Sequence, residues 1–321
     1  MSLSRLGVLF LIAASVLVSS SCGYYSRIMS RKDLVDGSLA YRERKFSEAE
    51  ELFRRAASRD PDGSTLEGKT AQVFLARTLH SQFIGNRQDT SKAEAAIAEY
   101  KKALSLNPND QSSYKAVASL LENLQKQDEW QKWVSERSTN ASIEPQYRAE
   151  ALTALAARQN TCANEISDTQ ETKKTVKGPD GKDAYQFVKP ADQAQFEQMK
   201  QCISKGTELI GQAMAVEPDA VKNAPSTDLK SLTDAQLKEL QELIKIFESA
   251  RSYRASLTIQ ASRLAEMEDR TADRDSLKSQ ADEYRKQYSD LGEVTRNIQT
   301  EIETRIAAAE ANANANANAK K

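Results

Sequence analysis

One stretch of the chain carries the letters of a phosphate-binding loop. Residues Gly63 to Thr70 read GSTLEGKT and fit the pattern G-x-x-x-x-G-K-[ST], in which backbone N–H groups and a lysine hold nucleotide phosphates. That chemistry also needs an apolar strand leading into the loop, whereas residues 54–62 read as the charged end of a helix. Glu67 would set a carboxylate against the phosphates. We therefore interpret the match as a coincidence and keep a nucleotide-dependent regulator only as an alternative.

Few other residues offer chemistry. His80 is the only histidine, which leaves no histidine pair for a metal ion, and no cysteine or serine nucleophile motif stands beside it. Cys162 and Cys202 lack the ligand spacing of a zinc site. Spacing alone does not exclude a Ser-His-Asp site assembled from distant positions. We expect no enzyme, no cofactor and no bound metal.

The composition favours a helical protein of balanced charge. The chain has 45 Lys and Arg against 46 Asp and Glu, with a formal net charge of −1, which indicates neither nucleic acid nor a strongly anionic surface as a partner. Aromatic residues and glycines are sparse, while Ala, Leu, Glu, Lys, Arg and Gln are abundant. That usage is typical of helices.

The N-terminus has the order of an export signal. Arg5 precedes an apolar run over residues 6–18, which at 18 − 6 + 1 = 13 residues is too short to span a bilayer. The small residues before Cys22 resemble a bacterial lipoprotein processing site, in which the cysteine becomes the lipidated N-terminus, although Ser19 stands where that family usually has leucine. The resemblance implies a membrane-anchored protein facing the periplasm. Cleavage near Ser21 to release a secreted protein, or an uncleaved anchor, are the alternatives.

The other two cysteines form an even pair if Cys22 carries the lipid. Export would place Cys162 and Cys202 in a compartment that permits disulfides, so we predict a bond between them. Two free, buried thiols are the alternative.

A helical pattern occurs twice in nearly the same form. Residues 45–61 read KFSEAEELFRRAASRDP and residues 93–108 read AEAAIAEYKKALSLNP. Both place a small, an aromatic and a small residue at helical spacing and end in proline. Small residues let a neighbouring helix approach closely, the ring fills the space between helices, and proline ends the helix. The equivalent pairs are Ala49 and Ala96, Phe53 and Tyr100, and Ala56 and Ala103.

These residues resemble the second helix of the tetratricopeptide repeat, and Gly37 to Tyr41 resembles its first helix. In this register Gly63 is a turn between repeats, Lys69 lies on the next helix, and two degenerate repeats follow from Gln111 and Pro145. The resemblance implies an all-α, right-handed helical solenoid of about four hairpins over residues 33–226, after a signal peptide (1–21) and a tether (22–32). First helices of the family line a groove for peptides or protein surfaces. The residues that would face it are Tyr41, Arg42, Gln72, Lys115, Ser119 and Asn123.

The repeats are followed or interrupted by other segments. An insertion over residues 163–201, clamped at its base by the predicted disulfide, holds a β-hairpin or a disordered loop around Pro179-Asp180-Gly181. Two apolar stripes, the second with coiled-coil spacing, predict a long antiparallel helical hairpin over residues 227–308 with a turn near 269–275, the alternative being one continuous rod. The Ala-Asn tail over 309–321 is expected to be disordered.

The resemblances imply a structural role. We expect a lipid-anchored envelope scaffold that binds other envelope proteins or peptides through the repeat groove, in outer-membrane, pilus or secretion assembly. The family's clamp for C-terminal carboxylates is not reproduced. Trp130 and Trp133 are interpreted as packing residues of the third repeat, and the alternative is an aromatic anchor for a partner peptide or for cell-wall glycan.

Overall fold

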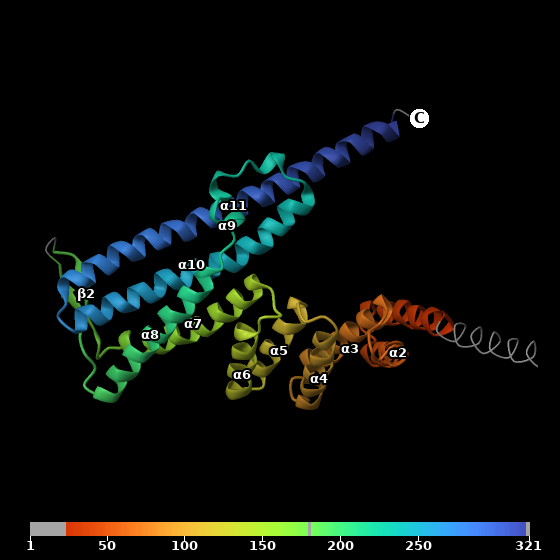
Figure 1. The fold of residues 1–321 in the computed structure, drawn as a ribbon, viewed down its shortest axis with the longest axis horizontal. Helices are drawn as coiled ribbons and strands as arrows, with labels where there is room; N and C mark the ends of the chain where they lie inside the picture. Colours follow the sequence, from red (N-terminus) through yellow and green to blue (C-terminus); the bar gives the residue numbers. More distant parts are fainter. Residues whose placement is uncertain (1–23, 179–180, 319–321) are drawn as a thin grey trace, which may run out of the picture. The chain divides into compact units, whose positions relative to one another are not determined.

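The computed structural model describes residues 24–178 and 181–318. The described chain is helical apart from one two-stranded antiparallel sheet (Figure 1), which confirms the all-α fold class and the small β-hairpin. Contacts divide the chain into two compact units, Met1–Trp130 and Gln131–Lys321. The predicted signal peptide and Cys22 lie before the first described residue.

The first unit consists of successive helices joined by short turns. Residues 24–42 are helical and are called the leading helix below. The helices that follow are α2 (Phe46–Ser58), α3 (Leu66–Gly85), α4 (Thr90–Leu106) and α5 (Gln111–Asn123), and α6 (Gln127–Thr139) runs across the division between the units.

These helices lie in two layers. The leading helix and α3 are joined by a hydrogen bond between the Tyr41 and Ser81 hydroxyls (2.8 Å), and α3 and α5 by one from Arg77 to Ser112 (3.2 Å). In the other layer, Lys92 at the start of α4 pairs with a carboxylate of α2, Glu50, at 2.9 Å. The leading helix, α3 and α5 therefore form one layer, and α2 and α4 the other.

The repeated small–aromatic–small pattern is buried in both of its copies. Phe53 of α2 and Tyr100 of α4 fill the space between the layers, and the alanines on either side of each ring are buried as well. A Cβ atom on Gly37 would come within 2.8 Å of the Phe53 ring, so the leading helix and α2 approach closely enough to need glycine there. The pattern therefore packs the helices in the way that its residue types predict.

The leading helix corrects one prediction. Residues 22–32 were expected to form a tether, but the chain is already helical at residue 24. The reason is a polar buried face: the Ser30 hydroxyl donates to the Ala56 carbonyl (3.1 Å), and Asp33 pairs with Arg55 (3.3 Å) and Arg59. These contacts with α2 hold the segment in place, and because they are polar, the helix face that packs on α2 has no apolar periodicity.

The second unit is built around longer helices. Its elements are α7 (Pro145–Ser167), β1 (Lys173–Lys177), β2 (Asp183–Phe187), α8 (Gln193–Ala215), α9 (Asp219–Lys222), the 3-10 turns η1 (Ala224–Ser226) and η2 (Leu229–Ser231), α10 (Asp234–Met267) and α11 (Thr271–Asn318).

The boundary expected near residue 226 is not where the units divide. α7 and α8, which the sequence placed in the repeats, pack on α10 instead. The buried Gln260 of α10 shows the contact: it accepts a hydrogen bond from Ser167 (2.9 Å) and donates one to Asn164 (3.1 Å), both on α7. Polar bridges of this kind leave no periodic signal, so the sequence assigned α7 and α8 to the preceding repeats.

The predicted disulfide joins α7 to α8. The Cys162 and Cys202 sulfurs are 2.06 Å apart, and their Cα atoms are separated by 6.2 Å. Both helices continue past the cysteines, so the insertion covers residues 168–192 rather than 163–201. The helices extend because residues on either side of the bond form a buried cluster: Ala163, Phe196, Met199, Cys202, Ile203 and Met267.

α10 and α11 form an antiparallel pair in which the long helices lie side by side (Figure 1). Pairs between them run in opposite directions along the two helices, and the turn contains Asp269 at φ 60°. The chain therefore turns back on itself and does not form one rod. The pairs are Arg254 with Tyr284 (2.8 Å), Arg251 with the Gln287 carbonyl (3.0 Å) and Arg305 with Asp234 (2.9 Å).

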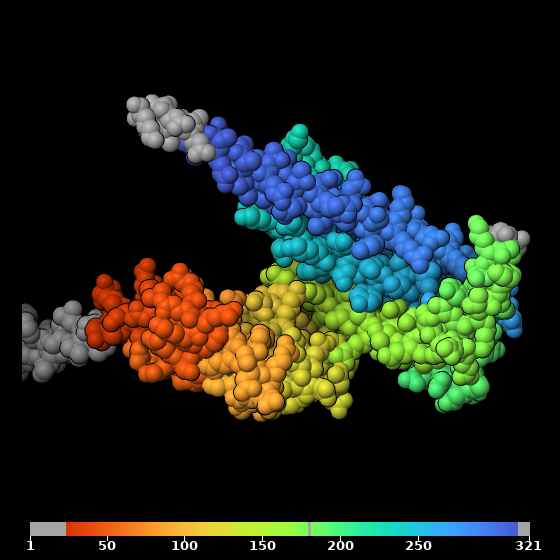
Figure 2. Space-filling view, turned by 180° about the vertical axis from the view of Figure 1, so that it is seen from behind, coloured from red at the N-terminus to blue at the C-terminus, as the bar shows by residue number. Residues whose placement is uncertain are grey.

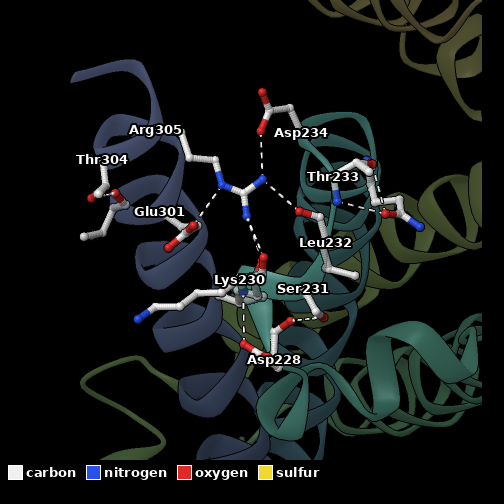
Figure 3. A network of polar contacts seen from close by, with 12 residues as sticks. Asp228, Lys230, Ser231, Leu232, Thr233, Asp234, Glu301, Thr304 and Arg305 are labelled. Carbon is white, nitrogen blue, oxygen red and sulfur yellow. Dashed lines mark hydrogen bonds and ion pairs between the residues drawn. The ribbon is translucent and has the colours of Figure 1, made fainter. Parts of the chain in front are cut away.

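One arginine of α11 secures the segment that leads into α10. The Arg305 guanidinium donates to the Leu229, Lys230 and Leu232 carbonyls (3.2, 3.2 and 2.8 Å) and pairs with Asp234 and Glu301 (Figure 3). Beside it, the Thr233 side chain and Gln236 form a capping box at the start of α10. One side chain thus holds the irregular segment before α10 against α11.

The end of α11 differs from the sequence prediction. Residues 309–321 were expected to be disordered, but α11 continues to Asn318. Alanine has the highest helix propensity, and extending an existing helix avoids the cost of nucleation. The lack of apolar residues therefore does not end the helix.

Candidate functional site

A groove opens between the leading helix and α3 in the first unit. It encloses 640 Å³, which is within the size range of binding sites for small ligands or peptide side chains. The leading helix contributes one wall and the first turns of α3 the other. We call it the arginine groove, and its lining residues are Arg27, Arg31, Leu34, Val35, Ser38, Arg42, Leu66, Glu67 and Thr70.

The groove carries an excess of positive charge. Arg27 pairs with Glu67 at 3.1 Å. The Glu67 backbone N–H and then Arg27 hold the pKa of this carboxyl below its usual range, so it is ionised at neutral pH and neutralises one arginine. Arg31 and Arg42 line the same groove, and the charge of Arg31 also helps to lower the pKa of Glu67. Three guanidinium groups thus face one carboxylate, which leaves net positive charge for an anionic ligand.

Apolar side chains border these arginines. Leu66 is 75% exposed and Val35 is 62% exposed, and both line the groove. Leu34 also lines the groove and is half-buried. An extended segment that alternates acidic and apolar side chains would match this lining, because carboxylates pair with guanidinium groups and apolar groups cover the exposed leucine and valine.

The six groove residues predicted from the sequence do not gather in one place. Arg42 lines the arginine groove. Tyr41 is half-buried and lies edge-on to Phe74, 6.5 Å between ring centres. Gln72 is a correction: its amide donates to the Glu99 carbonyl (3.1 Å) and carboxylate (2.7 Å), so it lies between α3 and α4.

The three remaining predicted residues lie along α5 and do not line the groove. Lys115, Ser119 and Asn123 are all exposed. The Asn123 side chain donates to the Ser119 carbonyl (2.8 Å) and accepts from Arg87 (2.9 Å). The second contact ties α5 to the turn after α3, and of the six predicted residues only Arg42 lines the arginine groove.

Sequence reasoning missed five groove residues on the leading helix. Arg27, Arg31, Leu34, Val35 and Ser38 fell in, or next to, the supposed tether. A signal was present in the spacing of the small or polar residues that face α2. They are Ser30, Asp33, Gly37 and Ala40, which follow helical steps of three, four and three.

The phosphate-loop motif forms a capped turn. Asp60 accepts hydrogen bonds from the backbone N–H groups of Ser64 (3.0 Å) and Thr65 (2.7 Å), and the Thr65 hydroxyl accepts from the Gly68 N–H (3.0 Å). These N–H groups are those that a phosphate would need, and a carboxylate or hydroxyl of the chain already occupies them. The motif therefore begins α3 and offers no phosphate cradle.

His80 is half-buried with Nδ1 3.4 Å from the Tyr100 hydroxyl, and Trp130 is buried while Trp133 is half-buried. Residues 24–178 and 181–318 contain no group of three or more His, Cys, Asp or Glu side chains arranged to hold a metal ion. Over the same range, no helix has both the length and the apolar character that crossing a membrane requires.

A second hollow lies in the other unit. It encloses 580 Å³ among α7, α10 and α11 and is lined mainly by amides, hydroxyls and two arginines. Arg263 is the more enclosed of the two and is already held by Asn164 (3.0 Å) and Ser167 (3.0 Å). The Asn160 Oδ1 and Arg263 Nε atoms in its lining have no hydrogen-bond partner among the described residues, but the hollow lacks the exposed aliphatic side chains of the arginine groove, which we favour as the functional site.

Comparison with known proteins adds no identity. No protein-family model matches this chain, and no curated protein matches it closely enough to be a relative.

Proposed function

We propose that this protein is a tetratricopeptide-like, lipid-anchored envelope scaffold that holds an acidic segment of another protein in the arginine groove. The observation that carries the proposal is the excess of arginines, Arg27, Arg31 and Arg42 against the single carboxylate of Glu67, beside the exposed Val35 and Leu66. A solvent-facing groove of this composition gains from a partner that brings carboxylates and apolar groups together.

The layered helices support the repeat interpretation. The two copies of the small–aromatic–small pattern are buried in α2 and α4, as the packing of this repeat family requires. A rigid, layered wall suits recognition of an extended segment, because the groove does not have to be ordered when the partner binds.

Cross-linking in cells tests the proposal. A photoreactive amino acid at Ser38, which lines the groove, should form an adduct with a specific envelope protein. The double variant Arg31→Ala, Arg42→Ala should reduce the adduct about tenfold, because each lost exposed ion pair contributes up to roughly 1 kcal/mol and about 1.4 kcal/mol is a factor of ten.

A matched control separates groove chemistry from net charge. Lys132→Ala with Lys238→Ala removes the same charge from two exposed lysines that do not line the groove, and it should leave the adduct unchanged. No adduct at Ser38, or an equal loss in both double variants, would contradict the proposed function.

A further inference from the structure

The leading helix exposes an unusual share of large apolar side chains. Ten such side chains are exposed among the residues whose side chains the structure describes, and five of them belong to this one helix. Most folded proteins bury these residues or scatter them singly, so a concentration on one helix indicates a surface that is covered in use. They are Tyr24 (71% exposed), Tyr25 (65%), Ile28 (48%), Val35 (62%) and Leu39 (49%).

Four of these residues lie along one side of the helix, with Arg31 and Lys32 in the turn between Ile28 and Val35. Tyr24, Ile28, Val35 and Leu39 are separated by steps of four, seven and four residues, which place them along one side of a helix. We call them the outer stripe. The buried residues Ser30, Asp33, Gly37 and Ala40 lie on the opposite side, against α2. In Figure 2 this helix belongs to the red end of the described chain.

Positive charge flanks the outer stripe. Arg27, Arg31 and Lys32 are exposed beside it and Asp36 is the exposed acid, while the Asp33 carboxylate is buried and paired. Of these cations, Arg27 is already paired with Glu67 across the groove. The near-neutral charge of the whole chain conceals this local excess of positive charge.

We propose that the outer stripe rests on the surface of an anionic lipid bilayer, with the leading helix lying along the membrane. Tyrosines are favoured at the level of the lipid headgroups, aliphatic side chains enter the boundary below them, and lysine and arginine reach outward to lipid phosphates. The stripe begins 24 − 22 = 2 residues after the predicted lipidation site, Cys22, so its first turn would already lie at the membrane.

The membrane contact overlaps the arginine groove at Val35 and Arg31 but includes residues that the groove does not use. Ile28 and Leu39 do not line the groove, whereas Arg31 and Arg42 do. Val35 lies at the border between the two surfaces. The inference therefore goes beyond the proposed partner binding and is tested at residues that the groove does not use.

Photolabelling from the lipid phase tests it on the full chain. The protein is reconstituted in vesicles of phosphatidylcholine with one quarter phosphatidylglycerol that contain a lipid with a photoreactive acyl chain, and labelled residues are mapped by mass spectrometry. We expect label within residues 24–42. The double variant Ile28→Ser, Leu39→Ser should reduce that label about tenfold, because two apolar contacts with the bilayer are lost. Vesicles of phosphatidylcholine alone should give weaker labelling of the same residues.

The control has the same chemistry elsewhere. Ile84→Ser with Ile306→Ser replaces side chains that are 56% and 53% exposed but belong to α3 and α11, and it should not change the label at residues 24–42. Unchanged helicity and melting temperature in both variants exclude unfolding as the cause.

Three outcomes would overturn the inference. Absence of label at residues 24–42 would exclude the bilayer as the occupant. Label that the stripe variant does not change would show that the stripe is not the contact. Cross-links at Ile28 to a second copy of the chain or to another protein, without lipid label, would assign the stripe to a protein interface instead.

Discussion

Three helix ends contain a residue in the left-handed backbone region where glycine is usual. Arg44, Gln125 and Asp269 have φ values of 62°, 56° and 60°. In each case the next N–H bonds to a carbonyl five residues back, the pattern that closes a helix end with a left-handed residue. The distances are 2.9 Å from Lys45 to Ala40, 2.9 Å from Lys126 to Leu121 and 2.8 Å from Arg270 to Ala265.

Glycine at these positions should stabilise the protein. A residue with a side chain loses roughly 1–2 kcal/mol of stability in this conformation. Glycine avoids this strain, but its larger conformational entropy in the unfolded chain offsets part of the stabilisation. We expect Asp269→Gly to raise the free energy of unfolding by about 0.5–1 kcal/mol, measured by urea denaturation. Arg270→Gly, one residue later, is the control and should not stabilise. A loss of stability in Asp269→Gly would contradict the assignment of strain to this residue.

Asp60 makes the start of α3 sensitive to acid. Partial burial raises the pKa of this carboxyl, but hydrogen bonds from Thr65 and then Ser64 outweigh that effect and lower the pKa to about 2. The contribution to stability is therefore fully present above the ordinary value of 3.8 and is lost as the pH falls through about 2.

Asp60→Asn should remove this dependence. Because the carboxylate is largely solvated, we expect a loss of about 1 kcal/mol at neutral pH rather than the full equivalent of the pKa shift. The difference between wild type and variant should shrink between pH 4 and pH 2, as followed by urea denaturation at each pH. A constant difference across that range would rule out the ionised carboxylate as the cause.

At the scale of elements, the disulfide holds α7 and α8 together across the insertion. The bond joins two cysteines that are 40 residues apart in sequence. On the loop-closure model, closing a loop of that length lowers the entropy of the unfolded chain by an amount worth roughly 3.9 kcal/mol. Cys162→Ser with Cys202→Ser should lower the melting temperature and speed protease cleavage within residues 168–190. Reduction of the wild type should have the same effect, and no further effect on the variant. Equal melting temperatures of the oxidised and reduced wild type would contradict a stabilising role of the disulfide.

Arg305 should govern the order of the segment before α10. Its guanidinium bonds three carbonyls there, so Arg305→Ala leaves those groups to water. We expect faster hydrogen exchange over residues 228–236 with little change in α7 or α8. Arg285→Ala is the matched control, because that arginine pairs with Asp282 on its own helix. Unaltered hydrogen exchange before α10 would show that the hydrogen bonds of Arg305 add no local stability.

The sequence predicted elements well where apolar or small residues repeat. The helices that carry Phe53 and Tyr100, the β-hairpin and the second apolar stripe of α11 all have a periodic signal. It failed where polar groups hold helices together. The leading helix packs through Ser30 and Asp33, and α7 meets α10 through Gln260, so neither contact has a hydrophobic period. The arginine groove was missed for the same reason, since it is built on the leading helix.

At the scale of the whole molecule, the two units should respond separately to local damage. The disulfide lies in the second unit, and its neighbours in the buried cluster all belong to that unit. Reduction should therefore raise hydrogen exchange in α7 and α8 and leave α3 and α4 as they were. Asp60→Asn should raise hydrogen exchange in α3 and α4 and leave hydrogen exchange in α7 and α8 unchanged. Exchange that rises throughout the chain in either case would show that the units unfold together.

The end of α11 that extends past Arg305 should lose its helical structure gradually on heating. α11 has 48 residues and α10 has 34, and the side chains of residues 306–313, beyond Arg305, are exposed. An isolated helix as short as residues 306–313 would be marginal in water, because forming the first helical turn costs free energy. Here the paired part of α11 supplies that first turn, so the end behaves as a helix–coil system with one fixed boundary. Its mean helical length is set by propagation alone and should shorten continuously on heating, well below the temperature at which the paired helices separate.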